Sequence, residues 1–183
     1  MNFPLFKSFR VSRLLTSFLN RKFDENKKQV GRWDNENSFD AEHGYQSKNL
    51  LWWKDKEFKN FVDGKLKRLI SSHLNVKRSQ VSYHWVHFLD YETGGSMNYH
   101  NHLHNEDFVL FIYLKDCKDG NTVFHLNNFD SEFAHRTKFE IQPRRGRSAI
   151  FSSYLMHKGE HTSENKRIFV VGIRVDLRKY LSV

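Results

Sequence analysis

The sequence has almost no cysteine: Cys117 is the only one in 183 residues. A single cysteine excludes a disulfide framework and is typical of proteins in a reducing compartment, so we expect a cytoplasmic location. Long hydrophobic runs are also missing, since none approaches the roughly 20 apolar residues that cross a bilayer. We find neither an internal repeat nor a low-complexity tract. These absences predict a folded protein without a membrane partner.

The composition is that of one folded domain. Hydrophobic residues make up 38% of the chain and aromatic residues 15%, which is more apolar surface than disordered chains carry. A length of 183 residues allows a single domain with a sizeable core. The net charge of +9 has two interpretations: an anionic partner such as nucleic acid, or a lysine-rich surface that binds none.

The N-terminal third is predicted to be mostly helical. Residues 1–22 contain Lys and Arg but no acid, and their large apolar residues recur at roughly helical spacing. An organelle-targeting peptide and an N-terminal helix docked on the domain share this pattern, and we favour the docked helix. Residues 23–47 are polar and are expected to form an extended covering segment. Residues 55–75 predict a clear helix with one apolar stripe. The stripe comprises Phe58, Phe61, Val62, Leu66, Leu69, Ile70 and Leu74.

From Val81 onward the apolar residues recur at every second position, which predicts strands. The expected strands lie near residues 81–92, 96–104, 108–115, 121–126, 137–142, 148–152, 154–158 and 167–176. The fold class is therefore mainly β with N-terminal helices, in the form of a small barrel or sandwich. We expect one structural domain, in which residues 1–80 form a helical covering segment packed on a core of residues 81–183.

Three histidines alternate within the stretch from Asp90 to Leu114. His100, His102 and His104 occupy every second position, so on a strand their imidazoles share one face. A polar face of this kind is costly to bury unless something binds it, and imidazole is a favoured ligand of iron and zinc. The pattern predicts a metal site held by a strand.

The second half of the chain adds a histidine and an arginine. His157 follows the apolar strand of residues 148–152, and Arg167 opens the last strand ten residues later. On a strand, Arg167 shares its face with Phe169, Val171 and Ile173. A guanidinium at the head of an apolar face needs an anionic partner, and its planar fork suits a carboxylate.

In this order and spacing, residues 81–176 resemble the iron(II)- and 2-oxoglutarate-dependent oxygenases. The resemblance is greatest to prolyl-hydroxylase-like members and to the phage-type oxygenases of this family. Tyr91, Gly95 and His100 match the tyrosine–glycine–histidine run of the family, and His102 falls at the carboxylate position of its His-x-Asp/Glu motif. The segment of residues 120–124 is similar to the Gly-Gly-x-Thr-x-Phe segment that follows in the family.

The resemblance implies both a fold and a chemistry. The fold is a double-stranded β-helix, a jelly roll like that of the cupins. His100, His102 and His157 are the implied catalytic metal ligands, and Arg167 and Tyr113 are the implied contacts of 2-oxoglutarate. The implied cofactors are Fe(II), 2-oxoglutarate as cosubstrate, and O2. The implied reaction hydroxylates a C–H bond and releases succinate and CO2, on an unidentified protein side chain or small molecule that is anionic or peptidyl.

One departure from the family leaves alternatives open. His102 replaces the usual carboxylate, and Glu106 or His104 are alternative ligands after a shift of register. Loss of the carboxylate also allows an altered or inactive site. Two functions of other classes compete: a cupin-type three-His metalloprotein that does not use 2-oxoglutarate, and a non-catalytic basic module that binds nucleic acid.

Overall fold

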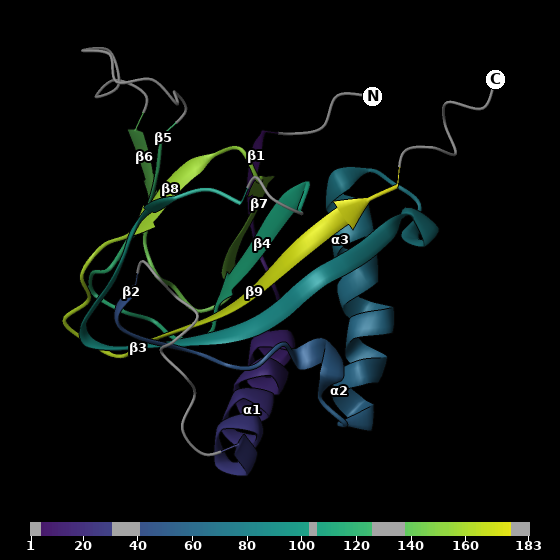
Figure 1. Cartoon of the computed structure of the whole chain (residues 1–183), viewed down its shortest axis with the longest axis horizontal. Coiled ribbons are helices and arrows are strands. Elements are labelled where there is room, and N and C mark those ends of the chain that lie inside the picture. The colour runs from purple at the N-terminus through teal and green to yellow at the C-terminus, as the bar shows by residue number, and fades with distance from the viewer. Residues whose placement is uncertain (1–4, 31–40, 103–105, 126–137, 177–183) are drawn as a thin grey trace.

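The computed structural model describes residues 5–30, 41–102, 106–125 and 138–176 (Figure 1). Within these residues the strands form one antiparallel sheet in the order β1-β7-β4-β9-β3-β8-β5-β6, with β2 paired to β3. In chain order the strands are β1 (Phe6–Arg10), β2 (Ala41–Gln46), β3 (Val81–His100), β4 (Phe108–Tyr113), β5 (Thr122–His125), β6 (Lys138–Ile141), β7 (Arg147–Ser152), β8 (Met156–Gly159) and β9 (Lys166–Val175).

The long strand β3 makes the sheet curl into a jelly roll. Residues 81–91 of β3 pair with β9, whereas Met97 and His100 pair with β8. One strand therefore belongs to both halves of the fold, and Figure 1 shows β5, β6 and β8 turned away from β4 and β9. The predicted fold class, a mainly β jelly roll with N-terminal helices, is confirmed.

Helices cover the outer side of the curled sheet. They are α1 (Arg13–Val30), α2 (Lys56–Phe61) and α3 (Lys67–Leu74), and a short π-helical turn of residues 62–66 joins α2 to α3. Figure 1 shows α1, α2 and α3 on one side of β3 and β9. The predicted helix of residues 55–75 is thus confirmed as a continuous helical segment.

The sheet separates two hydrophobic cores. The outer core lies between sheet and helices and includes Phe23, Phe58 and Phe169. The inner core lies within the curl and includes Phe111, Phe151 and Ile168. Because strand side chains alternate, neighbours on β9 enter different cores. This alternation decides which residues reach the functional site.

The boundaries predicted for the N-terminal third were partly wrong. Residues 6–10 form β1 on the edge beside β7, and the first helix begins only at Arg13 and continues to Val30. Phe6 packs on Phe124 of the inner core, whereas Phe9 stacks on His73 of α3. Apolar residues at this spacing suit an edge strand with one apolar residue on each face as well as a helix. Residues 41–46, expected in an extended covering segment, form β2.

A second correction concerns residues 81–104. Two strands were expected on either side of a turn at Gly94-Gly95, but residues 81–100 form the single strand β3. Gly94 has a φ of +85°, and a Cβ on Gly95 would lie 2.8 Å from the Glu92 carbonyl oxygen. The two glycines therefore mark an irregularity within the strand rather than a hairpin.

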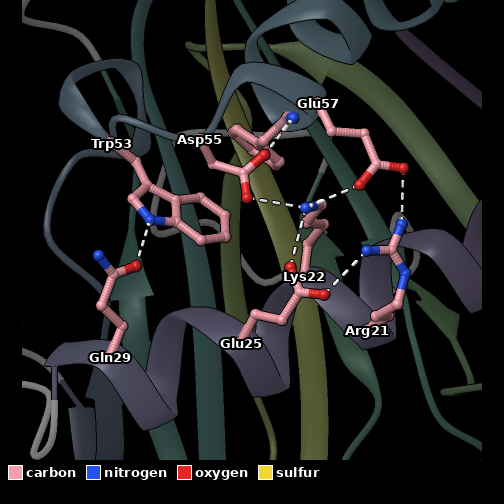
Figure 2. Close-up of polar contacts among 8 residues, drawn as sticks. Arg21, Lys22, Glu25, Gln29, Trp53, Asp55 and Glu57 are labelled. Atoms are coloured by element: carbon pink, nitrogen blue, oxygen red, sulfur yellow. Dashed lines mark hydrogen bonds and ion pairs between the residues drawn. The ribbon is translucent and has the colours of Figure 1, made fainter.

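A network of five charged side chains joins α1 to the start of α2 (Figure 2). Lys22 is only 3% exposed, and its Nζ lies 2.8 Å from Glu25, 2.8 Å from Asp55 and 2.9 Å from Glu57. Arg21 pairs with Glu25 and Glu57 at 2.8 and 2.7 Å. Burial alone would lower the pKa of Lys22, but hydrogen bonds to the three carboxylates raise it instead. The side chain of Lys22 therefore serves to hold α1 against α2.

No helix among the described residues is long and apolar enough to cross a membrane.

Candidate functional site

Three histidines meet where β3 and β8 pair. His100 lies opposite His157 in the β3–β8 register, and His102 follows the end of β3. One nitrogen from each ring can be chosen so that all three lie within 4.8 Å of one another. The ring centroids of His100 and His157 are 4.2 Å apart, and that of His102 lies 5.0 and 5.2 Å from them. The structure therefore brings together the three histidines predicted from the sequence.

The protonation of these rings suits a metal. Burial first, and then the neighbouring imidazoles, lower the pKa of His157 well below its usual value, and burial and His100 lower that of His102 to about 3. The Nδ1 atoms of His100 and His157 lie 2.9 and 3.0 Å from the carbonyl oxygens of Asn98 and Leu155. A carbonyl oxygen only accepts, so each Nδ1 carries the proton and each Nε2 keeps its lone pair. Neutral, oriented imidazoles of this kind are ligands for iron or zinc.

A cavity of about 270 Å³ contains this cluster and runs along β9. Its walls are mostly apolar, and they include Leu89, Phe111 and Phe151. Tyr91 pairs with Lys166 near one end, and Trp85 pairs with Gly172 near the other. Among the described residues that line the cavity, none is Asp or Glu.

Lys166 is a buried cation in the wall of this cavity. Lys166 is 1% exposed. Its Nζ donates to the carbonyl of Gly120 at 2.9 Å and lies 4.8 Å from the centroid of the Tyr91 ring. No carboxylate of the described residues lies within ion-pair distance of Nζ, although Asp119 and Glu160 act on it from farther away. Burial lowers the pKa of Lys166 to about 8. An ammonium buried without a carboxylate is costly, which indicates that this end of the cavity receives an anion.

Glycines make room for the Lys166 side chain. Gly120 has a φ of +76°, and a Cβ there would lie 2.8 Å from the Thr162 Cβ and 3.2 Å from the Lys166 Nζ. A Cβ at Gly159 would lie 3.7 Å from the same nitrogen. The close approach at Gly120 therefore requires glycine and fixes the carbonyl that Lys166 contacts.

Arg167 does not lie in the cavity, and its predicted role needs correction. Its Nη1 pairs with Asp24 of α1 at 2.9 Å, and its guanidinium lies over the ring of Phe23 at 4.3 Å. Arg167 does share a face with Phe169 and Val171, as predicted, but that face belongs to the outer core under the helices. The cavity face of β9 instead presents Lys166, the preceding residue.

Tyr113 lies behind the cavity wall rather than in it. Its hydroxyl makes a short hydrogen bond with Thr122 Oγ1 and donates to the carbonyl of Ile141 at 3.2 Å. Thr122, not Tyr113, lines the cavity. Tyr113 would therefore affect a ligand in the cavity only indirectly, by holding the Thr122 side chain in place.

The alternative ligands lie elsewhere or outside the described residues. Glu106 accepts a short hydrogen bond from the indole N–H of Trp85 and is not among the clustered residues. His161, four residues after His157 in the sequence, is also not part of the cluster, and its Nδ1 lies 3.0 Å from the Gly94 carbonyl oxygen. His104 lies outside the residues that the structure describes.

Two cavity residues were missed in the sequence. Lys166 was overlooked beside Arg167. Trp85 was not identified as a site residue, yet it lines the cavity with its ring 5.6 Å from that of His102. Gly172 is the one residue in the sequence that could have indicated which face of β9 lines the cavity, because it lies on the same face as Lys166. A Cβ there would lie 2.5 Å from the Trp85 ring.

Comparison with known proteins identifies the class of fold. No family model matches the chain, and no curated protein matches it in sequence. Solved structures do match over nearly the whole chain, and they confirm the fold implied by the resemblance, that of the 2-oxoglutarate- and iron(II)-dependent oxygenases.

Three of these structures show how far the likeness extends. A prolyl-4-hydroxylase of Pseudomonas putida is 11% identical, with a TM-score of 0.70 over 94% of this chain and 93% of that one. A viral collagen prolyl hydroxylase of Paramecium bursaria Chlorella virus-1, solved with 2-oxoglutarate, is 16% identical, with a TM-score of 0.63 over 94% and 97%. HygX of Streptomyces hygroscopicus, solved with nickel, 2-oxoglutarate and hygromycin B, is 12% identical, with a TM-score of 0.68 over 94% and 84%.

Proposed function

We propose that this protein is an Fe(II)- and 2-oxoglutarate-dependent oxygenase that hydroxylates a C–H bond of its substrate and releases succinate and CO2. One observation carries the proposal: a single cavity holds three clustered histidines and a buried lysine that has no carboxylate of the described residues at ion-pair distance. The first feature suits a metal and the second suits an anion. A short diacid that binds iron at one end and a cation at the other would satisfy both.

The residues have separate roles in this proposal. His100, His102 and His157 would hold the iron, which supplies the activation of O2. Lys166 would bind the far carboxylate of 2-oxoglutarate through a charge-assisted hydrogen bond. Thr122 also lines the cavity wall, where its hydroxyl is held by Tyr113. The apolar walls would exclude water, which strengthens the contact between Lys166 and the carboxylate.

The cavity also distinguishes this proposal from its two competitors. A cupin-type three-His protein that does not use 2-oxoglutarate has no need for a buried ammonium such as Lys166. A nucleic-acid-binding module without catalysis has no need for three clustered imidazoles in an apolar cavity. The neighbours were solved with substrates as different as a peptide fragment and hygromycin B, so we keep both a protein side chain and a small molecule as substrate classes. The cytoplasmic location stays a prediction.

The proposal is tested by turnover of 2-oxoglutarate with iron(II) in air, measured as succinate formed without added substrate. His157→Ala should abolish it, because one of three ligands is lost. His161→Ala is a matched control, since His161 lies four residues away and outside the cluster. The assignment of His157 as a metal ligand would be contradicted if His157→Ala still formed succinate. It would also be contradicted if His161→Ala lost as much succinate formation as His157→Ala.

A further inference from the structure

A second cavity, of about 520 Å³, lies on the outer side of β9 near its start. Its walls come from α1, the end of β4, the turn before β7 and the first residues of β9, and they include Asn20, Lys115, Asp116, Arg145 and Arg167. The Nδ2 atom of Asn20 donates to the Leu114 carbonyl at 2.7 Å, which ties α1 to the end of β4. The cavity is therefore formed by elements that are already fastened together.

Cations dominate the walls of this second cavity. Within the described part of the chain, Lys115 has no hydrogen bond or ion pair. The Arg145 side chain donates only to hydroxyls there, Thr16 Oγ1 at 3.0 Å and Ser17 Oγ at 2.7 Å. The Asp116 carboxylate accepts from the backbone N–H of Arg145 rather than from its guanidinium. Only Arg167, which pairs with Asp24, has its charge balanced by direct contact with a carboxylate.

Arg144 adds positive charge beside this cavity. It directly precedes Arg145 in the turn before β7, and its carbonyl accepts from the Arg147 N–H at 2.8 Å. Arg147 itself lies on the other face of β7, the face of Ala149 and Phe151 in the inner core.

We propose that this second cavity binds a small, multiply charged anion of the phosphate class. Arginine forks suit phosphate oxygens, and Lys115 adds a point charge that no described carboxylate neutralises. A volume of this size accommodates inorganic phosphate or a small phosphate ester. The site is separate from the histidine cavity, because Lys166 and Arg167 are adjacent on β9 and face opposite sides of the sheet.

The test is the unfolding temperature of the full chain, without added metal, in inorganic phosphate compared with sodium chloride of equal ionic strength. A ligand that binds the folded state raises this temperature with its concentration. We expect such a rise in the wild type, and an apparent affinity about tenfold weaker in Lys115→Gln, since one charge-assisted hydrogen bond is lost. Repeating the titration with glycerol 3-phosphate distinguishes an organic phosphate, which would bind more tightly, from the free ion.

Three further variants make the result specific. Lys118→Gln removes the same charge from the same loop, at a residue that does not line the cavity, and should leave the phosphate effect unchanged. Lys166→Met should also leave it unchanged, because Lys166 faces the other cavity. Arg145→Gln should weaken phosphate binding as Lys115→Gln does. For this variant the rise in unfolding temperature with phosphate is measured relative to the same variant in sodium chloride. The inference is overturned if phosphate gives no rise, if Lys118→Gln weakens binding as much, or if only Lys166→Met abolishes it.

Discussion

Two lysines of the described chain are almost fully buried, and they differ in what surrounds them. Lys22, 3% exposed, lies between three carboxylates at the junction of α1 and α2 (Figure 2). Lys166, 1% exposed, has no carboxylate of the described residues at ion-pair distance. The pKa of Lys22 is raised by its partners, whereas that of Lys166 is lowered by burial to about 8. The comparison indicates that Lys22 stabilises the fold, whereas Lys166 is placed to bind an anionic ligand.

The comparison is tested most strongly by the stability of two matched variants. Lys22→Met should lower the free energy of unfolding by about 1–2 kcal/mol, because it removes the cation between three carboxylates. Only Glu25 and Glu57 then keep an ion pair, the one with Arg21. The effect is smaller than for a fully buried pair because these carboxylates are partly exposed. Lys166→Met should raise the free energy of unfolding by about 1 kcal/mol, because it removes a buried charge that lacks a partner.

Denaturant unfolding of the protein without ligands measures both changes under one condition. The expected outcome is a change of opposite sign in the two variants. If Lys166→Met destabilises the protein as much as Lys22→Met, then Lys166 is held by contacts that stabilise the fold and the distinction fails.

A second variant adds a carboxylate to the cavity that lacks one. His102→Asp should bind iron(II) at least as tightly as the wild type, with an increase in affinity on the order of tenfold, because it adds a negative charge at the metal. Glu106→Gln serves as the control: Glu106 contacts Trp85 rather than the cluster, so iron affinity should stay unchanged. Loss of iron from His102→Asp would contradict this prediction, because a carboxylate at this position could then not replace the imidazole at the metal.

The lowered pKa of Lys166 predicts how 2-oxoglutarate binding depends on pH. In the free protein Lys166 is charged below about pH 8 and neutral above it, whereas in the unfolded chain it titrates near 10.5. Affinity should therefore be constant up to about pH 8 and then fall, approaching about tenfold per pH unit as one proton must be taken up on binding. Calorimetric titration across this range measures the effect. An affinity that does not change up to about pH 9 would mean that Lys166 is not the group that binds the anion.

The same titration of Lys166 affects protein stability in the opposite direction: stability rises over the pH range in which the affinity for 2-oxoglutarate falls. Below about pH 8 the folded protein carries a charged, buried Lys166, and the lowered pKa costs stability there. Stability should recover as pH rises from about 8 toward 10.5, because the unfolded chain then binds more protons than the folded one.

The smallest expected effect is in acid, at the Lys22 network. Hydrogen bonds from Arg21 and Lys22 lower the pKa of Glu57 to about 2 from 4.5. Burial would raise the pKa of Asp55, but the Lys22 hydrogen bond outweighs it and lowers the pKa below 3.8. These groups stabilise the fold above their unfolded pKa values, and this contribution should be lost as pH falls from about 4.5 to 2. Acid unfolding of Lys22→Met should show a shallower decline over this range than the wild type.

The metal cluster was predictable because it depends on local rules. His100 and His102 share a strand face through the two-residue period alone. His157 then joins them because β8 pairs with the end of β3, a pairing implied by the resemblance rather than by the residues themselves. Strand periodicity behind a helical stripe predicted a mainly β fold, and the resemblance implied that this fold is a jelly roll.

The anion site was not predictable in the same way. Both faces of β9 are apolar, since Phe169 and Val171 face the helices while Ile168 and Val170 face the cavity side. Alternation places Lys166 and Arg167 on opposite faces of β9. Only the packing of α1 on the sheet decides which of these faces lies under the helices and which lines the cavity. The N-terminal strand β1 was missed for a related reason, because it exists through pairing with the distant strand β7.

The central claim is tested most directly by anaerobic titration of the iron(II)-loaded protein with 2-oxoglutarate, followed by its visible absorption and by calorimetry. The account predicts tight binding in the wild type and in Arg167→Met. In Lys166→Met it predicts a loss of binding of about 2–5 kcal/mol, as expected when one partner of a buried charge pair is removed. Arg167 is the matched control, one residue away on the opposite face. Weakened binding in Arg167→Met with unchanged binding in Lys166→Met would contradict the account.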